Sequence, residues 1–379
     1  GDVVFKNLFN KSKNTFEMLG SFTSIASNYT DLTSLLPNIL GKSIPSVMDK
    51  FGTFNMTGTT EITSSNIDAD LDIDTEIGYI IAKLALQDVN DIDNAAYKGN
   101  VIFDEFLMGK LIDNEKIGEV SFNVYADGKG FRPDNINTLV EGTIYGLNYN
   151  DYYYTNVTLN GNLRDKIFNG YINTKDDHLD LNFQGLVDFS EAENNYNFNA
   201  EVNHANLKAL NFVKNDTISL FKGRVAMNMK GTTLDNAYGT IDFQNTLYTN
   251  EYDAYYFKDF SIASNFNNNE RTLSVNSPEI IEGTMKGDFK LNEVAKLVEN
   301  SLGNLYTNYR PYAIANDQYI AFNFKVYNKI AEVFYPGLHI GRNTFFKGSI
   351  GSNAKAFNLV FKSPEISIDE HHATKIELR

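Results

Sequence analysis

Cysteine and tryptophan are both absent from this chain of 379 residues. Without cysteine the protein has no disulfide framework, no thiol nucleophile and no cysteine-ligated zinc site. Proline is scarce, with 7 residues, so few positions interrupt a regular strand. No apolar run approaches the ~18–20 residues that a membrane-spanning helix needs. The chain opens on Gly1, and we expect that it contains no signal peptide and that any membrane anchor lies outside it.

Basic residues are fewer than acidic ones, with 33 Lys and Arg against 48 Asp and Glu, so the net charge is −15. An acidic chain repels phosphate backbones, so we expect no nucleic-acid partner. The same charge disfavours docking of the chain itself onto anionic lipid headgroups. Solvation of an extended surface is the plainest role for the excess carboxylates.

Motifs that carry catalysis are missing too. The sequence has no G-x-S-x-G elbow, no G-x-x-x-x-G-K-[ST] loop and no G-x-G-x-x-G after a strand. The five histidines never fall in HExxH spacing. The acidic series from Asp68 to Glu76 could suggest calcium, but carboxylates on alternate residues of a strand lie ~6.6–6.8 Å apart and do not converge. We therefore expect no catalytic residue, no metal and no cofactor, and predict that the protein is not an enzyme.

Alternation of apolar and polar residues dominates what is present, together with 28 Phe and 22 Tyr. Strict alternation indicates strands with one dry and one wet face. We predict that the apolar positions of these strands line one surface. They are Leu71, Ile73, Ile77, Val120, Phe122, Val124, Leu179, Leu181, Phe183, Val225, Met227, Met229, Ile241, Phe243, Leu273, Val275, Ile320, Phe322 and Phe324.

Strand patterns fill most of residues 53–290 and 318–379, with no helix of ~10–15 residues between successive strands, which excludes a parallel α/β fold. The predicted fold is all-β: a long twisted antiparallel or mixed sheet curled into an open hydrophobic groove, with a few short helices. Residues 1–52 are expected to combine strands with short amphipathic helical turns. Residues 53–290 and 318–379 are expected to be continuous groove repeats, joined by a helix and connection over 291–317.

Glycine recurs between polar and apolar residues of these strands, which predicts bulges, bends or close backbone approach. The positions are Gly99, Gly142, Gly161, Gly185, Gly223, Gly287 and Gly348. The sequence Ser-Pro-Glu-Ile occurs twice, at Ser277–Ile280 and Ser363–Ile366. Because proline cannot donate to a ladder, both copies are predicted to end strands at a sheet margin.

Three segments break the alternation. Residues 31–50 predict two short helical turns with proline corners, and residues 204–212 one short helix. Residues 291–309 are the strongest helix candidate, with Asn292 as N-cap. Its apolar positions are Val294, Leu297, Val298, Leu302 and Leu305. That helix either packs on the sheet or covers an open end of the groove.

Tyrosines cluster at Tyr145–Tyr154 and at Tyr252–Tyr256. Exposed aromatic platforms bind sugars, although tyrosine is also a common rim residue where a dry surface meets water. A β-sandwich or adhesin-like glycan-binding module is therefore the alternative to a groove. A transmembrane barrel would need regular strands of ~9–11 residues with aromatic girdles, and the unequal strands and helical breaks count against it.

Three stretches of this sequence resemble the central region of TamB/AsmA-like proteins, in the form found in Bacteroidota. They are Phe51–Gly78 (FGTFNMTGTTEITSSNIDADLDIDTEIG), Gly142–Gly185 and Gly283–Ile320. The resemblance covers most of the chain and is carried by β-repeat texture and glycine placement. It implies an open trough, the β-taco, with apolar side chains on its concave face.

The resemblance also implies a function. Members of this translocation and assembly module family are bridge-like lipid transfer proteins in the periplasm of Gram-negative bacteria. They are tethered to the inner membrane at the N-terminus and reach the outer membrane at the C-terminus, where they form a complex with a BamA/TamA-like barrel. The implied partners are phospholipid acyl chains in the hydrophobic groove, with membrane and barrel contact through parts outside this chain. The implied roles are lipid transport and outer membrane biogenesis.

Overall fold

The structure is a computed structural model, and it describes residues 1–7, 16–35, 46–91, 94–131, 134–213, 217–303, 308–328, 331, 335, 337–353 and 357–379. Its 22 strands belong to one sheet that does not close. Every strand pairing described is antiparallel, and the helices are few and short. The predicted class, an all-β fold built on one long open sheet, is confirmed.

The chain forms two compact units. The N-terminal unit comprises residues 1–190 with 209–214, and the C-terminal unit comprises residues 191–208 with 215–379. The division therefore falls inside the segment 53–290, for which the strand pattern predicts one continuous set of repeats.

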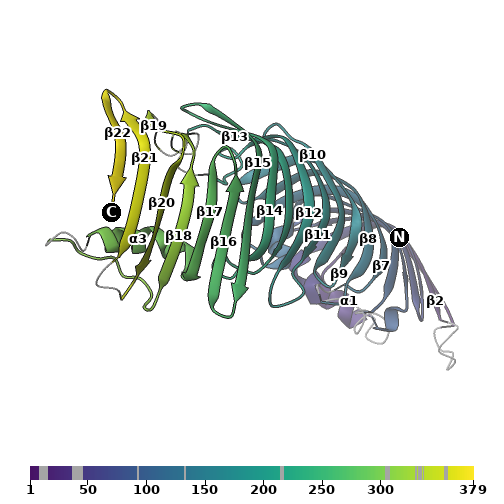
Figure 1. Ribbon diagram of the computed structural model, residues 1–379. Helices are drawn as coiled ribbons and strands as arrows, with labels where there is room; N and C mark the ends of the chain where they lie inside the picture. The colour runs from purple at the N-terminus through teal and green to yellow at the C-terminus, as the bar shows by residue number, and fades with distance from the viewer. Residues whose placement is uncertain are drawn as a thin grey trace. The chain divides into compact units, whose positions relative to one another are not determined.

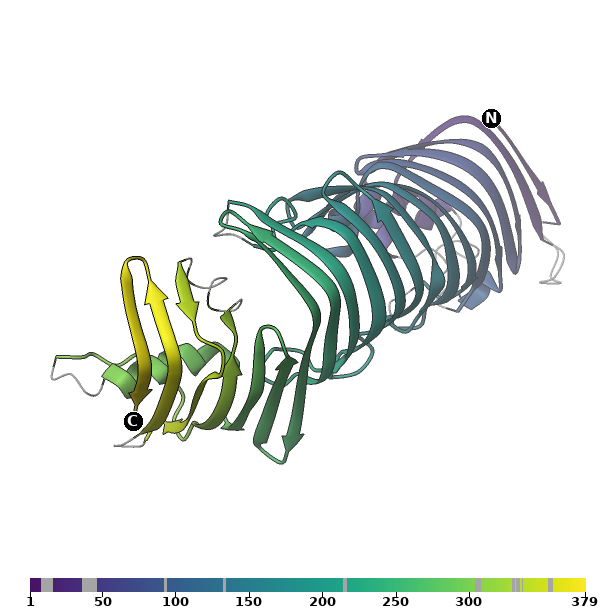
Figure 2. The ribbon, with the colours of Figure 1, turned by 45° about the horizontal axis from the view of Figure 1, so that its top comes forward.

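Strands of the N-terminal unit follow one another as a meander, each hydrogen-bonded to the next (Figure 1). Figure 2 shows them as long ribbons that bow together in one direction. They are β1 (Asp2–Lys6), β2 (Glu17–Ser27), β3 (Phe54–Thr63), β4 (Asn66–Thr75), β5 (Gly78–Gln87), β6 (Ala96–Leu107), β7 (Ile117–Lys129), β8 (Asn137–Tyr149), β9 (Tyr152–Arg164), β10 (Ile167–Lys175) and β11 (Leu179–Asp188).

Strands of the C-terminal unit continue the same pattern until its last part. They are β12 (Asn195–Asn206), β13 (Ser219–Lys230), β14 (Tyr238–Asn250), β15 (Ala254–Asn267), β16 (Glu270–Ser277), β17 (Ile281–Asp288), β18 (Tyr319–Val326), β19 (Leu338–Ile340), β20 (Thr344–Gly351), β21 (Asn358–Ile368) and β22 (His371–Leu378). There β19 and β20 pair with different parts of β21, and β20 also pairs with β18.

Helical segments are α1 (Tyr29–Leu35), η1 (Ser46–Phe51), η2 (Val89–Asp91), α2 (Met108–Ile112), η3 (Leu291–Glu293) and α3 (Val294–Gly303). Helical turns do occur within 31–50, but the proline corners lie outside the described residues. The helix predicted over 204–212 is wrong, because β12 passes a register shift at Val202/Ala205 and runs on to Asn206. Within the described ranges, no helix is long and apolar enough to cross a bilayer.

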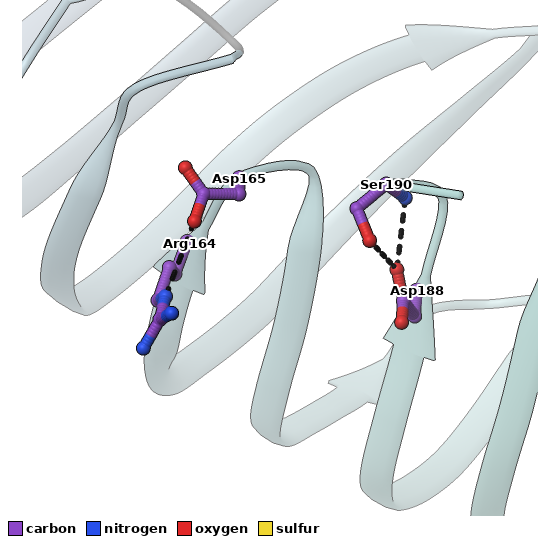
Figure 3. Close-up of polar contacts among 4 residues, drawn as sticks. All are labelled: Arg164, Asp165, Asp188 and Ser190. Atoms are coloured by element: carbon purple, nitrogen blue, oxygen red, sulfur yellow. Dashed lines mark hydrogen bonds and ion pairs between the residues drawn. The ribbon is translucent and has the colours of Figure 1, made fainter.

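Tight turns set the register of the meander. Asp165 and Lys166 join β9 to β10 with φ angles of 48° and 67°, the left-handed pair that suits the twist of a two-residue hairpin. Arg164 Nε lies 3.2 Å from Asp165 Oδ2 (Figure 3). Beyond the neighbouring strand, Asp188 Oδ1 accepts hydrogen bonds from the Ser190 amide at 2.8 Å and from its hydroxyl at 2.5 Å (Figure 3).

Glycines allow close approach of neighbouring strands, as their spacing predicts. One cross-strand row from β6 to β11 is rich in glycine and contains Gly99, Ala126, Val140, Gly161, Gly170 and Gly185. A Cβ on Gly170 would lie 2.5 Å from Gly161 Cα, and one on Gly99 would lie 1.9 Å from Lys83 O. Gly223 lies at a register shift between Lys222 and Arg224, so a bulge also occurs.

The two Ser-Pro-Glu-Ile copies lie at different positions relative to their strands. Ser277 ends β16 as predicted, and its hydroxyl donates to Asp259 O at 2.8 Å. The prediction is wrong for Pro364, which lies inside β21. Pairing to β22 is interrupted opposite Pro364, where Lys375 has φ 56°, so this proline need not supply a ladder donor on that side.

We predict that Gly99→Val destabilises the N-terminal unit by roughly 2 kcal/mol or more, because Gly99 has φ +147° and a Cβ would overlap Lys83 O. The matched control is Asn100→Val, on the neighbouring exposed position of the other face. Thermal unfolding followed by circular dichroism measures both. Equal midpoints for the two variants would contradict the close approach.

Candidate functional site: an apolar face of the sheet

Hydrogen-bond register gathers the predicted apolar residues of the N-terminal unit into rows that cross the strands. The first, which we call the Phe122 row, consists of Ile73, Ile80, Phe103, Phe122, Ile144, Val157, Thr174 and Leu181. The second, the Val124 row, consists of Leu71, Ala82, Val101, Val124, Gly142, Leu159, Ile172 and Phe183. The rows are two residues apart along each strand, so they share one face.

The other predicted residues of this unit border the two rows. Ile77 and Val120 are buried in a cluster with Ile80 and Phe106. Leu179 lies two residues before Leu181 on β11 and so faces the same side. The register thus places every predicted apolar residue of the N-terminal unit on or beside one apolar face.

Rows of the same kind cross the C-terminal unit. The Met227 row consists of Phe198, Met227, Ile241, Ile262, Val275, Gly283, Phe324, Phe346 and Phe361. The Met229 row consists of Tyr196, Met229, Gly239, Ser264, Leu273, Met285, Phe322, Gly348 and Leu359. Val225 pairs with Phe243 two residues further along, and Ile320 continues β18 on the same side. This unit also has an apolar face.

Most of these side chains are incompletely covered. Of the 19 predicted positions, Ile77, Val120, Ile320 and Phe324 are buried, and the other 15 are partly exposed. In a sandwich a second sheet would cover such a face. Here all strands of the described residues belong to a single sheet, so the apolar faces retain solvent-accessible hydrophobic surface.

Short helical segments cover the apolar faces only locally. In the N-terminal unit, Phe51 of η1 and Met108 and Leu111 of α2 pack on the buried cluster around Phe106. Lys50 joins these two segments by donating to Leu111 O at 2.9 Å and Asp113 Oδ2 at 2.6 Å. Of the described residues on β8–β11, only Ile144 and Leu147 pack on this cluster.

In the C-terminal unit, α3 lies beside β18 and β20 (Figure 1) and packs on their apolar face. Leu297 is 1% exposed and contacts the cluster of Phe289, Ile320 and Ile350. The predicted apolar stripe is only partly right, because Val298 and Leu302 are 37% and 40% exposed. Ser301 is buried instead, and its hydroxyl donates to Leu297 O at 2.8 Å.

The start of this helical segment also differs from the prediction. Asn292 lies inside η3, whose N-cap is Lys290, so Asn292 is not the cap. The Leu291 amide is held instead by Asp235 Oδ1 at 2.8 Å. A tertiary contact thus replaces the local cap. Leu305 lies outside the described residues.

A buried arginine is the polar feature that the sequence reasoning missed. Arg271 is 2% exposed on β16, two residues before Leu273 on the apolar side. Its guanidinium donates to Ser264 Oγ at 2.9 Å, Leu234 O at 2.8 Å and Ala237 O at 3.0 Å. Burial lowers the pKa of Arg271, and Asp235 opposes that shift. The sequence did contain a signal for this site, because Arg271 is a charged residue at a position where the alternation calls for an apolar one.

The opposite face of the N-terminal unit is polar. Lys83 pairs with Asp70 at 3.2 Å and Lys98 with Asp127 at 2.8 Å, all on exposed side chains. Such pairs contribute little stability. Within the residues that the structure describes, no three His, Asp or Glu side chains come together as a metal site.

The tyrosine clusters are divided between faces, because successive residues of a strand point to opposite sides. Tyr153 is 46% exposed, whereas its neighbours Tyr152 and Tyr154 are partly buried on the other side. Tyr255 is 6% exposed between the exposed Tyr252 and Tyr256. Successive tyrosines of each run therefore lie on different faces of the sheet, and the glycan-binding alternative stays a prediction.

We predict that Leu297→Ala destabilises the packing of α3 by about 2–4 kcal/mol, since it removes a fully buried side chain. Val298→Ala, at the adjacent exposed position, should change stability by about 0.5 kcal/mol or less. Hydrogen exchange of the α3 amides measures both variants. If both variants lose the same amount of amide protection, Val298 contributes as much as Leu297 to the packing of α3, as the predicted stripe implies.

No family model, curated protein or solved structure matches this chain. The TamB/AsmA-like resemblance therefore stays a prediction that depends on the residues quoted for it.

Proposed function

We propose that this chain carries phospholipid acyl chains along its apolar faces, as a segment of a periplasmic lipid-transfer protein and not as an enzyme. The observation that supports this most is the Val124 row, whose apolar side chains cross the sheet, are partly exposed, and on β9–β11 lie outside the cluster on which the described helical segments pack. Exposed contiguous apolar surface in a folded protein marks a binding surface.

The energetics favour acyl chains as the occupant. Transfer of each CH₂ group from water to an apolar surface is favourable by ~0.8 kcal/mol. Moving two long acyl chains from a membrane into bare water therefore costs on the order of 20–25 kcal/mol. A row of similar apolar positions offers many binding sites of nearly equal energy, so a chain can move from one to the next. No step of this process requires a reactive side chain.

The wider setting is part of the same proposal. A TamB/AsmA-like bridge would lie in the periplasm of a Gram-negative bacterium, between the inner membrane and a BamA/TamA-like barrel of the outer membrane. Both contacts would be made by parts outside this chain. The acidic polar face fits such a role because it keeps a long sheet solvated while its other face binds lipid.

Charges placed on the Val124 row should abolish lipid binding. We predict that Leu159→Asp with Phe183→Asp weakens binding of a tail-labelled phospholipid at least about tenfold, because an unpaired charge in the apolar contact is unfavourable. Thr158→Asp with Gln184→Asp is the matched control, on the adjacent exposed positions of β9 and β11. Fluorescence titration measures affinity, and circular dichroism verifies folding.

Mass spectrometry of lipids extracted from the purified protein provides a second readout. Phospholipid should accompany the unmodified chain and the control, and should be lost from the row variant. Equal lipid content in all three proteins, or none in the unmodified chain, would rule out the apolar face as the binding surface.

A further inference from the structure

An aromatic cluster borders the apolar face of the N-terminal unit where β9 begins and β10 turns into β11. Tyr154 pairs with Leu147, which in turn pairs with the buried Val120, so its ring continues a row of the apolar face. Tyr152 lies two residues away on the same side. His178 lies in the turn that connects β10 to β11. We call Tyr152, Tyr154, Asp176 and His178 the rim cluster.

The rings of the rim cluster stand at steep angles to one another. Tyr152 and Tyr154 have ring centroids 4.7 Å apart with planes at 78°. Tyr152 and His178 have centroids 5.9 Å apart with planes at 51°. The rings contact one another, so a cation would lie against the outer side of the cluster, where it is attracted by the negative electrostatic potential of a ring face.

Asp176 adds a full negative charge beside these rings. Its carboxylate accepts from the Tyr152 hydroxyl, from the Thr155 amide at 2.9 Å and hydroxyl at 2.8 Å, and from the His178 amide at 2.9 Å. Partial burial acts to raise the pKa of Asp176, but these hydrogen bonds outweigh it and lower the pKa below its ordinary value. The group is therefore ionised at neutral pH.

The nearest cation along the chain faces away. Lys175 precedes Asp176 but lies one residue after Thr174, which belongs to the Phe122 row, so its side chain points to the polar face. Asp177 follows Asp176 and is exposed. The rim cluster thus combines aromatic faces with acidic charge directly beside an apolar surface.

We propose that the rim cluster receives the ammonium group of an ethanolamine- or choline-type phospholipid headgroup, while the acyl chains lie on the Phe122 and Val124 rows. This inference rests on the proposed function and names the class of lipid. A phosphoglycerol headgroup has no cationic group that could bind to the rings. Its net negative charge is also repelled by the carboxylate of Asp176.

Tail-labelled phosphatidylethanolamine and phosphatidylglycerol with identical acyl chains test the proposal by titration of the purified chain. We predict that the ethanolamine lipid binds about 5- to 30-fold more tightly, the range expected for a cation held by aromatic faces. Tyr154→Leu keeps the apolar bulk but removes the ring, so it should bring the ratio of the two affinities close to one. Asp176→Asn should lower the ratio in the same direction.

Two variants control for packing. Tyr154→Phe retains the aromatic face and should keep the preference. Tyr153→Leu changes the neighbouring tyrosine on the opposite face and should also keep it. Circular dichroism verifies that each variant is folded.

The possible failures are distinguishable. If both lipids bind equally, or if the preference survives Tyr154→Leu and Asp176→Asn, the headgroup site is wrong while acyl-chain binding stands. If neither lipid binds, both the headgroup site and the proposed function are wrong.

Discussion

The antiparallel hydrogen-bond register is the constraint on which the apolar faces depend. Each strand contributes alternate residues to each side, so the rows exist only while neighbouring strands keep their pairing. A slip of one residue in a single strand would move all its apolar side chains to the polar face. Tight turns with left-handed residues, such as Asp165 and Lys166, fix that pairing at the ends of the strands.

Strand alternation made most of the fold predictable from sequence. Leu71 and Ile73 lie between Asp70, Asp72 and Asp74, and such a pattern already divides a strand into two faces. The register then brings together residues as distant as Leu71 and Phe183, which alternation alone does not specify. Cross-strand rows are a property of pairing, and pairing follows from turn lengths and bulges.

The features that escaped prediction depend on tertiary contacts. Local spacing assigns Val298 and Leu302 to a buried stripe, but the packing of α3 on Ile320 and Ile350 buries Leu297 and Ser301 instead. Arg271 is charged, which argues for exposure, yet carbonyls of residues 234 and 237 accept its hydrogen bonds in the interior. Neither partner is near in sequence, so no local pattern identifies them.

The apolar rows have an evolutionary consequence. A surface that binds through many similar positions requires a class of side chain at each one and rarely a particular residue, since exchanges among Leu, Ile, Val, Phe and Met preserve it. Selection on such a surface preserves alternation and strand length while individual residues drift. A chain of this kind can keep a regular architecture long after its sequence has lost detectable likeness to its relatives.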